Sequence, residues 1–101
     1  TLEEKLQEEK IKLQNLRKQK VASLLAQTDY VITKISDLKT QLELEIITSD
    51  TYNAELQKYL PVLQKRHNIR DWNVSIETRV QNATSLEELK QIEQEIHGYQ
   101  G

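Results

Sequence analysis

The chain has no cysteine, no methionine and no phenylalanine, and among its 101 residues it has only two glycines and one proline. Without cysteine there is no disulfide and no thiolate chemistry, a usage that fits an intracellular or virion protein. The glycines, Gly98 and Gly101, stand at the very end, so helix breakers and tight-turn signals are almost missing before residue 98. No run approaches the roughly 18 apolar residues of a membrane-spanning helix.

Large apolar side chains are too few for an ordinary globular domain of this length. Hydrophobic residues make up 37% of the chain and charged residues 30%. The apolar residues recur periodically, which argues against disorder and favours a thin helical structure with a narrow apolar stripe. We therefore expect one helical domain over residues 1–101. Because the chain begins with Thr1 and not Met, a segment cut from a longer polypeptide is an alternative.

A heptad pattern between Val21 and Leu42 is the strongest periodic signal. Apolar residues there recur at alternating steps of three and four, as in the seam of a coiled coil. Upstream leucines fit a heptad offset by one residue, the spacing of a stutter. The predicted packing or oligomer seam consists of Leu6, Leu13, Leu16, Val21, Leu24, Thr28, Val31, Ile35, Leu38 and Leu42. Leu2, Leu6, Ile11 and Leu13 have no evident partner within the chain unless the third helix reaches them, so we expect self-association through this helix, as a parallel dimer or trimer.

The segment 25–37, LAQTDYVITKISD, raises the question of whether residues 2–47 are one helix or two. Thr28 and Asp29 are residues that usually open a helix, so a joint near residues 27–29 is one alternative. The heptad runs through the segment without a reset, which favours a continuous helix with Thr28 as a polar layer. Replacing Thr28 by Ile should then raise thermal stability and loosen oligomer specificity. A drop in stability would instead indicate a helix cap.

Two further helices are predicted, over residues 50–82 and 85–97. Ser49 or Asp50 can cap the first of them, and the short connection implies an antiparallel return. Pro61 lies inside this second helix, where we expect a kink because the apolar stripe continues on both sides. The predicted fold is thus all-α, a coiled-coil-like helical hairpin with a short third helix.

The third helix should begin with a capping box, either Thr84 with Glu87 or Ser85 with Glu88. If the chain reverses at residue 49, residue i lies roughly beside residue 98 − i, because both helices rise equally per residue. The acidic third helix would then start beside the basic run near the N-terminus.

That basic run is an alternative site for binding nucleic acid or an anionic surface. It consists of Lys10, Lys12, Arg17, Lys18 and Lys20. The interpretation we favour is a solvated helix face, or one paired with the acidic third helix. A nucleic-acid face usually carries aromatic residues for stacking, and Tyr30 is the nearest aromatic residue.

No catalytic, cofactor or metal site is predicted. Serine and threonine stand mostly at helix boundaries, where capping explains them, and there is no glycine-rich phosphate loop. His67 and Asp71 are four residues apart, but no further ligands converge on them, so an exposed pair is the simpler interpretation. Trp72 shares an apolar stripe with its helical neighbours, so we favour a core position for it. Arg66, Arg70 and Trp72 remain possible interface anchors.

Three segments together resemble a known group of proteins. They are residues 25–35 (LAQTDYVITKI), 64–73 (QKRHNIRDWN) and 83–89 (ATSLEEL). Their order resembles small helical proteins or modules encoded in tail gene clusters of bacteriophages and prophages. In those proteins a "TDY…K" helix, a helix with two arginines four apart and an "A-[ST]-x-E-E-L" helix follow one another. This chain departs from them in its long charged first helix and in the deeper position of Pro61.

The resemblance implies a tail fibre, baseplate or tail assembly role and no enzyme activity. We accordingly expect a structural or assembly component of a phage-tail-like particle that acts through helical self-association. Its expected partners are copies of itself and other tail or baseplate proteins, without a small-molecule substrate, nucleic acid or membrane. The virion or the host cytoplasm is the expected location. A helical adaptor that binds an anionic surface through the basic run is the alternative.

Overall fold

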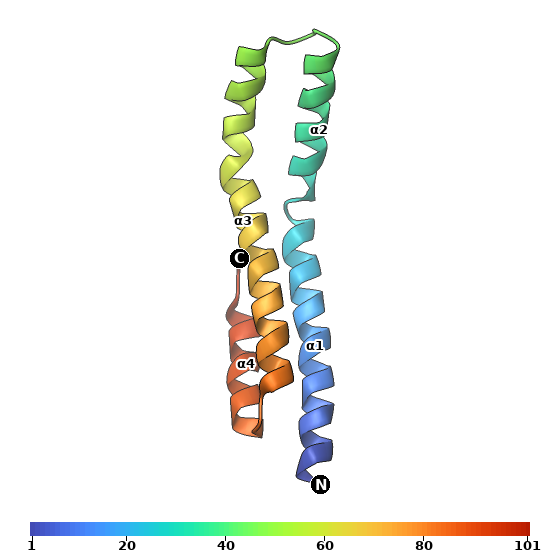
Figure 1. Ribbon diagram of the computed structural model, residues 1–101, viewed down its shortest axis with the longest axis vertical. Helices are drawn as coiled ribbons and strands as arrows, with labels where there is room; N and C mark the ends of the chain where they lie inside the picture. The colour runs from blue at the N-terminus through green and yellow to red at the C-terminus, as the bar shows by residue number, and fades with distance from the viewer.

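A computed structural model describes residues 1–101 as four α-helices without strands, which confirms the predicted all-α class. The helices are α1 (Leu2–Ala26), α2 (Asp29–Glu43), α3 (Ser49–Asn82) and α4 (Leu86–Gly98). Together they form a rod of 65 × 18 × 17 Å. Figure 1 shows α1 and α2 end to end, α3 returning beside both, and α4 folded back along the lower part of α3. The hairpin is therefore three helices thick at one end and two at the other.

The stretch predicted as one helix over residues 2–47 is in fact two helices, so the continuous-helix prediction is wrong. Ala26 ends α1 and Asp29 begins α2, with Thr28 at φ −118° and ψ 3° between them. The carbonyl of Leu25 accepts from the Thr28 N–H at 3.0 Å and from the Thr28 hydroxyl at 3.1 Å. A threonine that bonds back to the preceding turn in this way competes with the helical ladder. The heptad hid the joint because the interruption is short: the Gln27 N–H still bonds to the Ser23 carbonyl at 3.3 Å, and Leu24, Thr28 and Val31 all stay buried.

The loop between α2 and α3 begins earlier than the sequence suggested. Glu45 has a φ of 60°, and its N–H and that of Ile46 bond back to the carbonyls of Leu42 and Gln41 at 3.1 and 2.9 Å. This is a Schellman ending, in which a left-handed residue closes the helix. Glycine usually fills that position, so the glutamate there gives no sequence signal for the end of α2.

The helix caps differ from the predicted ones at one place and agree at another. Thr48 caps α3 by accepting from the Thr51 N–H at 3.2 Å, where Ser49 or Asp50 had been expected. At α4, Ser85 accepts from the Glu88 N–H at 3.1 Å, which is one of the two predicted capping pairs.

The early reversal also changes which residues lie side by side. The side chain of Gln14 donates to the carbonyl of Glu77 at 3.1 Å, and Lys10 Nζ donates to the carbonyl of Gln81 at 2.9 Å. The numbers in both pairs add to 91, so the predicted pairing of residue i with 98 − i is wrong by seven. The cause is the end of α2 at Glu43, several residues before the predicted boundary. The helix α3 continues through Pro61 to Asn82, and a bend at that proline stays a prediction.

The main core lies where three helices meet. Its buried members are Leu13, Ile76, Val80, Ala83, Leu89, Ile92 and Ile96, with Leu6, Leu16 and Trp72 packed against them. The core that includes the apolar face of α4 thus gives Leu6, Leu13 and Leu16 partners within the chain, while Leu2 and Ile11 stay exposed. Burying these side chains stabilises the fold by about 1.5–3 kcal/mol each relative to exposure.

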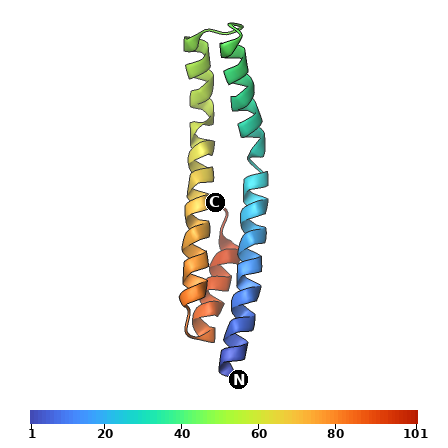
Figure 2. The ribbon, with the colours of Figure 1, turned by 45° about the vertical axis from the view of Figure 1, so that its right-hand side comes forward.

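The other end of the rod is a two-helix arm, formed by α2 and the part of α3 beside it, residues 29–66. Between Val31 and Arg66, no side chain of the arm is fully buried. Figure 2 shows that only α2 and α3 are present at this end, while α4 stays at the opposite end. Two helices alone do not enclose their seam, so the apolar residues of the arm beyond Val31 remain half-buried or exposed.

Candidate interaction surfaces

A buried arginine of α3 bonds to the junction between α1 and α2, at the base of the arm. Arg66 Nη1 donates to the Thr28 hydroxyl at 2.8 Å, to the Leu25 carbonyl at 3.0 Å and to Asp29 Oδ1 at 3.0 Å. The arginine is 6% exposed, whereas the Asp29 side chain is 66% exposed. The two uncharged acceptors are therefore the sheltered partners of this guanidinium. Arg66, predicted as a possible interface anchor, is occupied within the chain, and its buried Nε lacks a hydrogen-bond partner.

Most of the basic run is also occupied within the chain. Lys12 forms an ion pair with Glu93 of α4 at 3.3 Å, and Lys20 donates to the carbonyl of His97 at 3.3 Å. Lys10 donates to a carbonyl of α3, as described above. Of the two favoured interpretations, a solvated helix face or one paired with the acidic third helix, the pairing is present for Lys12. Lys18 is left exposed.

Arg17 is the fifth cation of that run, and it is buried to 5% exposure. Its Nε donates to Gln14 at 2.9 Å, Nη1 donates to the amide oxygen of Asn73, and Nη2 lies 3.6 Å from Glu77. Each of the three guanidinium nitrogens has a partner, and Asn73 and Glu77 belong to α3. Arg17 is therefore a structural link between α1 and α3. It is not available to an anion from solution.

The C-terminal residues after α4 lie along α3. Trp72 and Tyr99 stack with ring centroids 3.9 Å apart and an interplanar angle of 5°. A Cβ at Gly101 would lie 2.7 Å from Lys65 Cε, so the chain end touches α3 closely. Burial raises the pKa of Tyr99 above its ordinary value of 10.0. Trp72 therefore belongs to the packing of α3 against α4, as the favoured interpretation had it, while Arg70 stays exposed.

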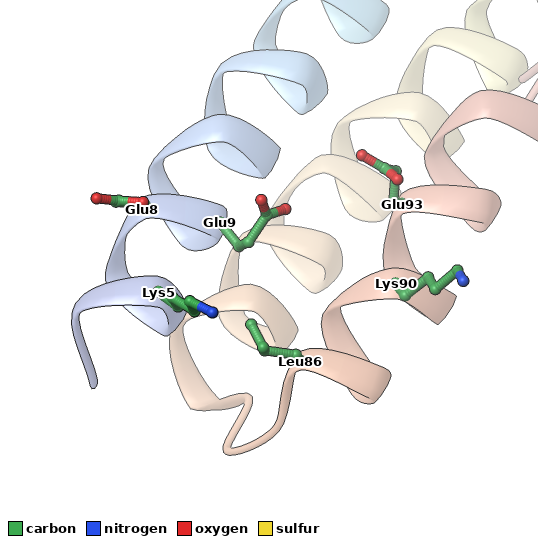
Figure 3. A pocket seen from close by; sticks show the side chains of 6 residues that line it. All are labelled: Lys5, Glu8, Glu9, Leu86, Lys90 and Glu93. Atoms are coloured by element: carbon green, nitrogen blue, oxygen red, sulfur yellow. The ribbon is translucent and has the colours of Figure 1, made fainter. Parts of the chain in front are cut away.

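An open groove runs between α1 and α4 near the N-terminus. Figure 3 shows its lining, with Lys5, Glu8 and Glu9 on α1 facing Leu86, Lys90 and Glu93 on α4. Leu86 points into the space between the helices, while Glu8 and Lys90 extend outward on opposite sides. Two lysines and three glutamates offset one another in charge, and one leucine offers little apolar surface. The groove thus has neither a strong field nor an apolar floor.

Titratable side chains do not gather into a reactive cluster. His67 and Asp71 form an exposed ion pair at 3.2 Å with side chains 66% and 71% exposed. No group of three or more His, Cys, Asp or Glu residues converges as metal ligands would. None of the four helices combines the length and the apolar content needed to cross a membrane.

The arm presents an apolar surface, the arm face, that the sequence analysis did not identify. Ile32 and Leu60 are 47% and 42% exposed. Each directly follows a residue that points toward the seam, Val31 in α2 and Tyr59 in α3. In antiparallel helices, the residues that follow seam positions turn to the same side. The numbers of Ile32 and Leu60 add to 92, as do those of Glu43 and Ser49 at the ends of α2 and α3, so the two residues lie at one level.

More apolar residues continue the arm face above and below that level. On α3, Leu56 and Leu63 precede and follow Leu60 at helical spacing, and on α2 Ile35 follows Ile32. Ile46 in the loop is 66% exposed. By the same geometry α4 lies on the other side of the hairpin, since it packs on α1 and α3 through residues that precede their seam positions. Apolar residues of α2 and α3 that lie beside one another could reveal this face from the sequence. Finding them requires the correct residue at which the chain reverses.

The predicted seam residues divide between the two ends of the rod. Leu13, Leu24, Thr28 and Val31 are buried inside the single chain. Ile35, Leu38 and Leu42 in the arm are only half-buried. The buried members serve packing within the chain and cannot also line a seam between chains.

Comparisons with protein family models, with curated protein sequences and with solved structures find no match to this chain.

Proposed function

We propose that this chain is a structural or assembly component that acts through contacts with protein chains, in a phage-tail-like particle. The two-helix arm is the observation that supports a role in protein contacts. Its seam is only half-buried, and Ile32 and Leu60 expose apolar surface at one level of one face. Exposed apolar surface that is grouped on one face is typical of interaction sites.

The particle assignment rests on the three segments that resemble phage-tail proteins. Two of these segments meet in space, since Arg66 of the second segment bonds Thr28 and Asp29 of the first. In the third, Ser85 caps α4 and Leu89 is in the core. The residues that carry the resemblance therefore hold the helices together. The resemblance supports a shared architecture, and the part of the arm between residues 36 and 63 lies outside the resembling segments.

The alternative, an anion-binding adaptor, has less support from the contacts. Four of the five cations between Lys10 and Lys20 bond to groups of α3 or α4, and only Lys18 does not. Using the run as a binding face would require these contacts to break first.

Co-purification with the tail and baseplate proteins encoded beside this chain tests the proposed function. The chain should carry a tag before Thr1, because Gly101 lies against Lys65 and Ile69. We expect a stable complex with at least one of these proteins. A variant with Lys10, Lys12, Lys18 and Lys20 changed to Gln serves as the control, and the complex should survive these changes. Absence of any complex, or steeply salt-dependent DNA binding that the four changes abolish, would contradict the proposal.

A further inference from the structure

We infer that the arm face is covered by the arm of a second copy of this chain, in antiparallel orientation, so that two arms form a four-helix bundle. This inference rests on the proposed function, because it names the partner of the same surface. The apolar residues that meet would be Ile32, Leu56, Leu60 and Leu63, with Ile46 of each loop reaching the base of the other arm.

The first argument is the incomplete seam of the arm. At the lower end of the rod, α4 supplies the third helix, and Leu13, Ile76 and Ile96 reach full burial. In the arm, where α4 is absent, Ile35, Leu38 and Leu42 stay half-buried although they continue the heptad of the buried Leu24 and Val31. Adding two helices across the arm face completes a bundle of four around them, an arrangement in which such seam residues are enclosed.

The second argument is the distribution of charge along the arm. Its tip, residues 40–53, contains Glu43, Glu45 and Asp50 and no lysine or arginine, a formal charge of −3. Its base, residues 29–36 and 56–66, contains one aspartate against four cations, a formal charge of +3 in which Arg66 is buried against Asp29 and Lys58 pairs with Glu55 just beyond the base. The base charges are Asp29, Lys34, Lys58, Lys65 and Arg66. Antiparallel arms place each acidic tip beside a basic base.

Orientation and identity of the partner follow from that charge distribution. A parallel pair would place tip against tip and base against base, which sets like charges together. An anionic membrane is disfavoured because the exposed Leu44 and Ile46 of the tip stand beside Glu43 and Glu45. Within one chain, Lys58 already donates to Glu55 at 2.8 Å, which raises the pKa of Lys58 and keeps it charged. The arm of a second copy supplies both the apolar residues and the opposite charges that the arm face would contact.

Sedimentation of the purified chain at about 100 μM tests for the dimer, a concentration that populates complexes with a Kd in that range. The expected result is a species of twice the 11.9 kDa chain mass. It should dissociate as salt is raised, because screening weakens the tip-to-base attraction. A wild-type monomer overturns the inference but leaves the co-purification test of the proposed function untouched.

Variants of the arm face locate the contact. Ile32→Glu and Leu60→Glu should each give a monomer with unchanged helix content by circular dichroism, since both side chains are already partly exposed. The matched control is Tyr30→Glu, which lies on the same helix with 57% exposure and precedes Val31. The control should remain dimeric. A dimer that survives both arm-face changes would overturn the proposed surface.

Charge reversal tests the orientation without touching the apolar face. Changing Glu43, Glu45 and Asp50 to Lys should weaken the dimer, and adding Lys34→Glu, Lys58→Glu and Lys65→Glu should restore it. In a parallel dimer the first set of changes would leave association nearly as in the wild type. Because the chain has no cysteine, a single Leu44→Cys gives a further readout. Rapid disulfide formation between two tips would show a parallel pair and overturn the inference.

Discussion

Arg66 in α3 donates a 2.8 Å hydrogen bond to the hydroxyl of Thr28, the residue that separates α1 from α2. The same hydroxyl donates to the Leu25 carbonyl. One threonine thus ends a helix by bonding backward and holds the opposite helix by accepting from its arginine. The Thr28 hydroxyl therefore takes part both in the joint between α1 and α2 and in the contact of α3 with them.

Thr28→Ile should lower stability, contrary to the expectation from the heptad alone. The change removes one of the two sheltered acceptors of a guanidinium that is 6% exposed, at a cost of about 1–3 kcal/mol. Thr28→Ser keeps the hydroxyl and should retain most of the stability. Asp29→Asn, at the 66% exposed acceptor, should change the free energy of unfolding by less than about 1 kcal/mol. Urea unfolding of the three variants gives the comparison, and an increase for Thr28→Ile would contradict this role of the joint.

Arg17→Met should lower the free energy of unfolding by about 1–3 kcal/mol, since it leaves Asn73 and Gln14 without their donor. The methionine keeps much of the apolar volume, so the loss would report on the polar link. Lys18→Met, the next residue along α1 and exposed, is the control and should change stability by less than about 0.5 kcal/mol. Equal effects at the two positions in thermal unfolding would show that Arg17 does not link α1 to α3.

Glu45→Gly should stabilise the hairpin. Glu45 holds a φ of 60°, a left-handed conformation that costs a residue with a Cβ about 1–2 kcal/mol. Glycine removes that cost but loses more backbone entropy, so a net gain of about 0.5–1 kcal/mol is expected. Glu43→Gly, in the last turn of α2, is the matched control and should lose about 1 kcal/mol. Urea midpoints that fall for both variants would rule out the left-handed strain at Glu45.

Stability should fall above about pH 10 in a way that depends on Tyr99. Burial raises the pKa of the folded Tyr99 above 10.0, so the unfolded chain loses this proton first as the pH rises. The unfolded state is then favoured progressively above the unfolded pKa, while below it Tyr99 contributes no pH dependence. Thermal melts from pH 8 to 11 should show a smaller decline for Tyr99→Phe than for the wild type. The phenylalanine keeps the stack on Trp72, so identical declines would place Tyr99 in solvent.

Local patterns predicted part of this fold correctly. The class, the antiparallel return, the Ser85–Glu88 cap and the pairing of Lys12 with α4 all depend on short-range signals or on charge, and these were visible in the sequence. The joint at Thr28 was considered as an alternative but not preferred, because the heptad runs through it and because Arg66, which bonds the Thr28 hydroxyl, lies 38 positions away. The reversal point was missed because Glu45 adopts a left-handed backbone conformation, which glutamate rarely does.

The amino-acid sequence by itself determined that this chain is helical and thin. Helical periodicity, the scarcity of glycine and proline and the absence of cysteine are properties of the chain that no packing alters. Only the tertiary structure decided which apolar residues are buried inside the single chain. Leu13 is enclosed because α4 packs over its level, whereas Ile32 and Leu60 stay exposed because no third helix reaches the arm. Periodicity marks a side chain as apolar and facing a seam, but the length and docking of the covering helix decide whether water leaves that seam.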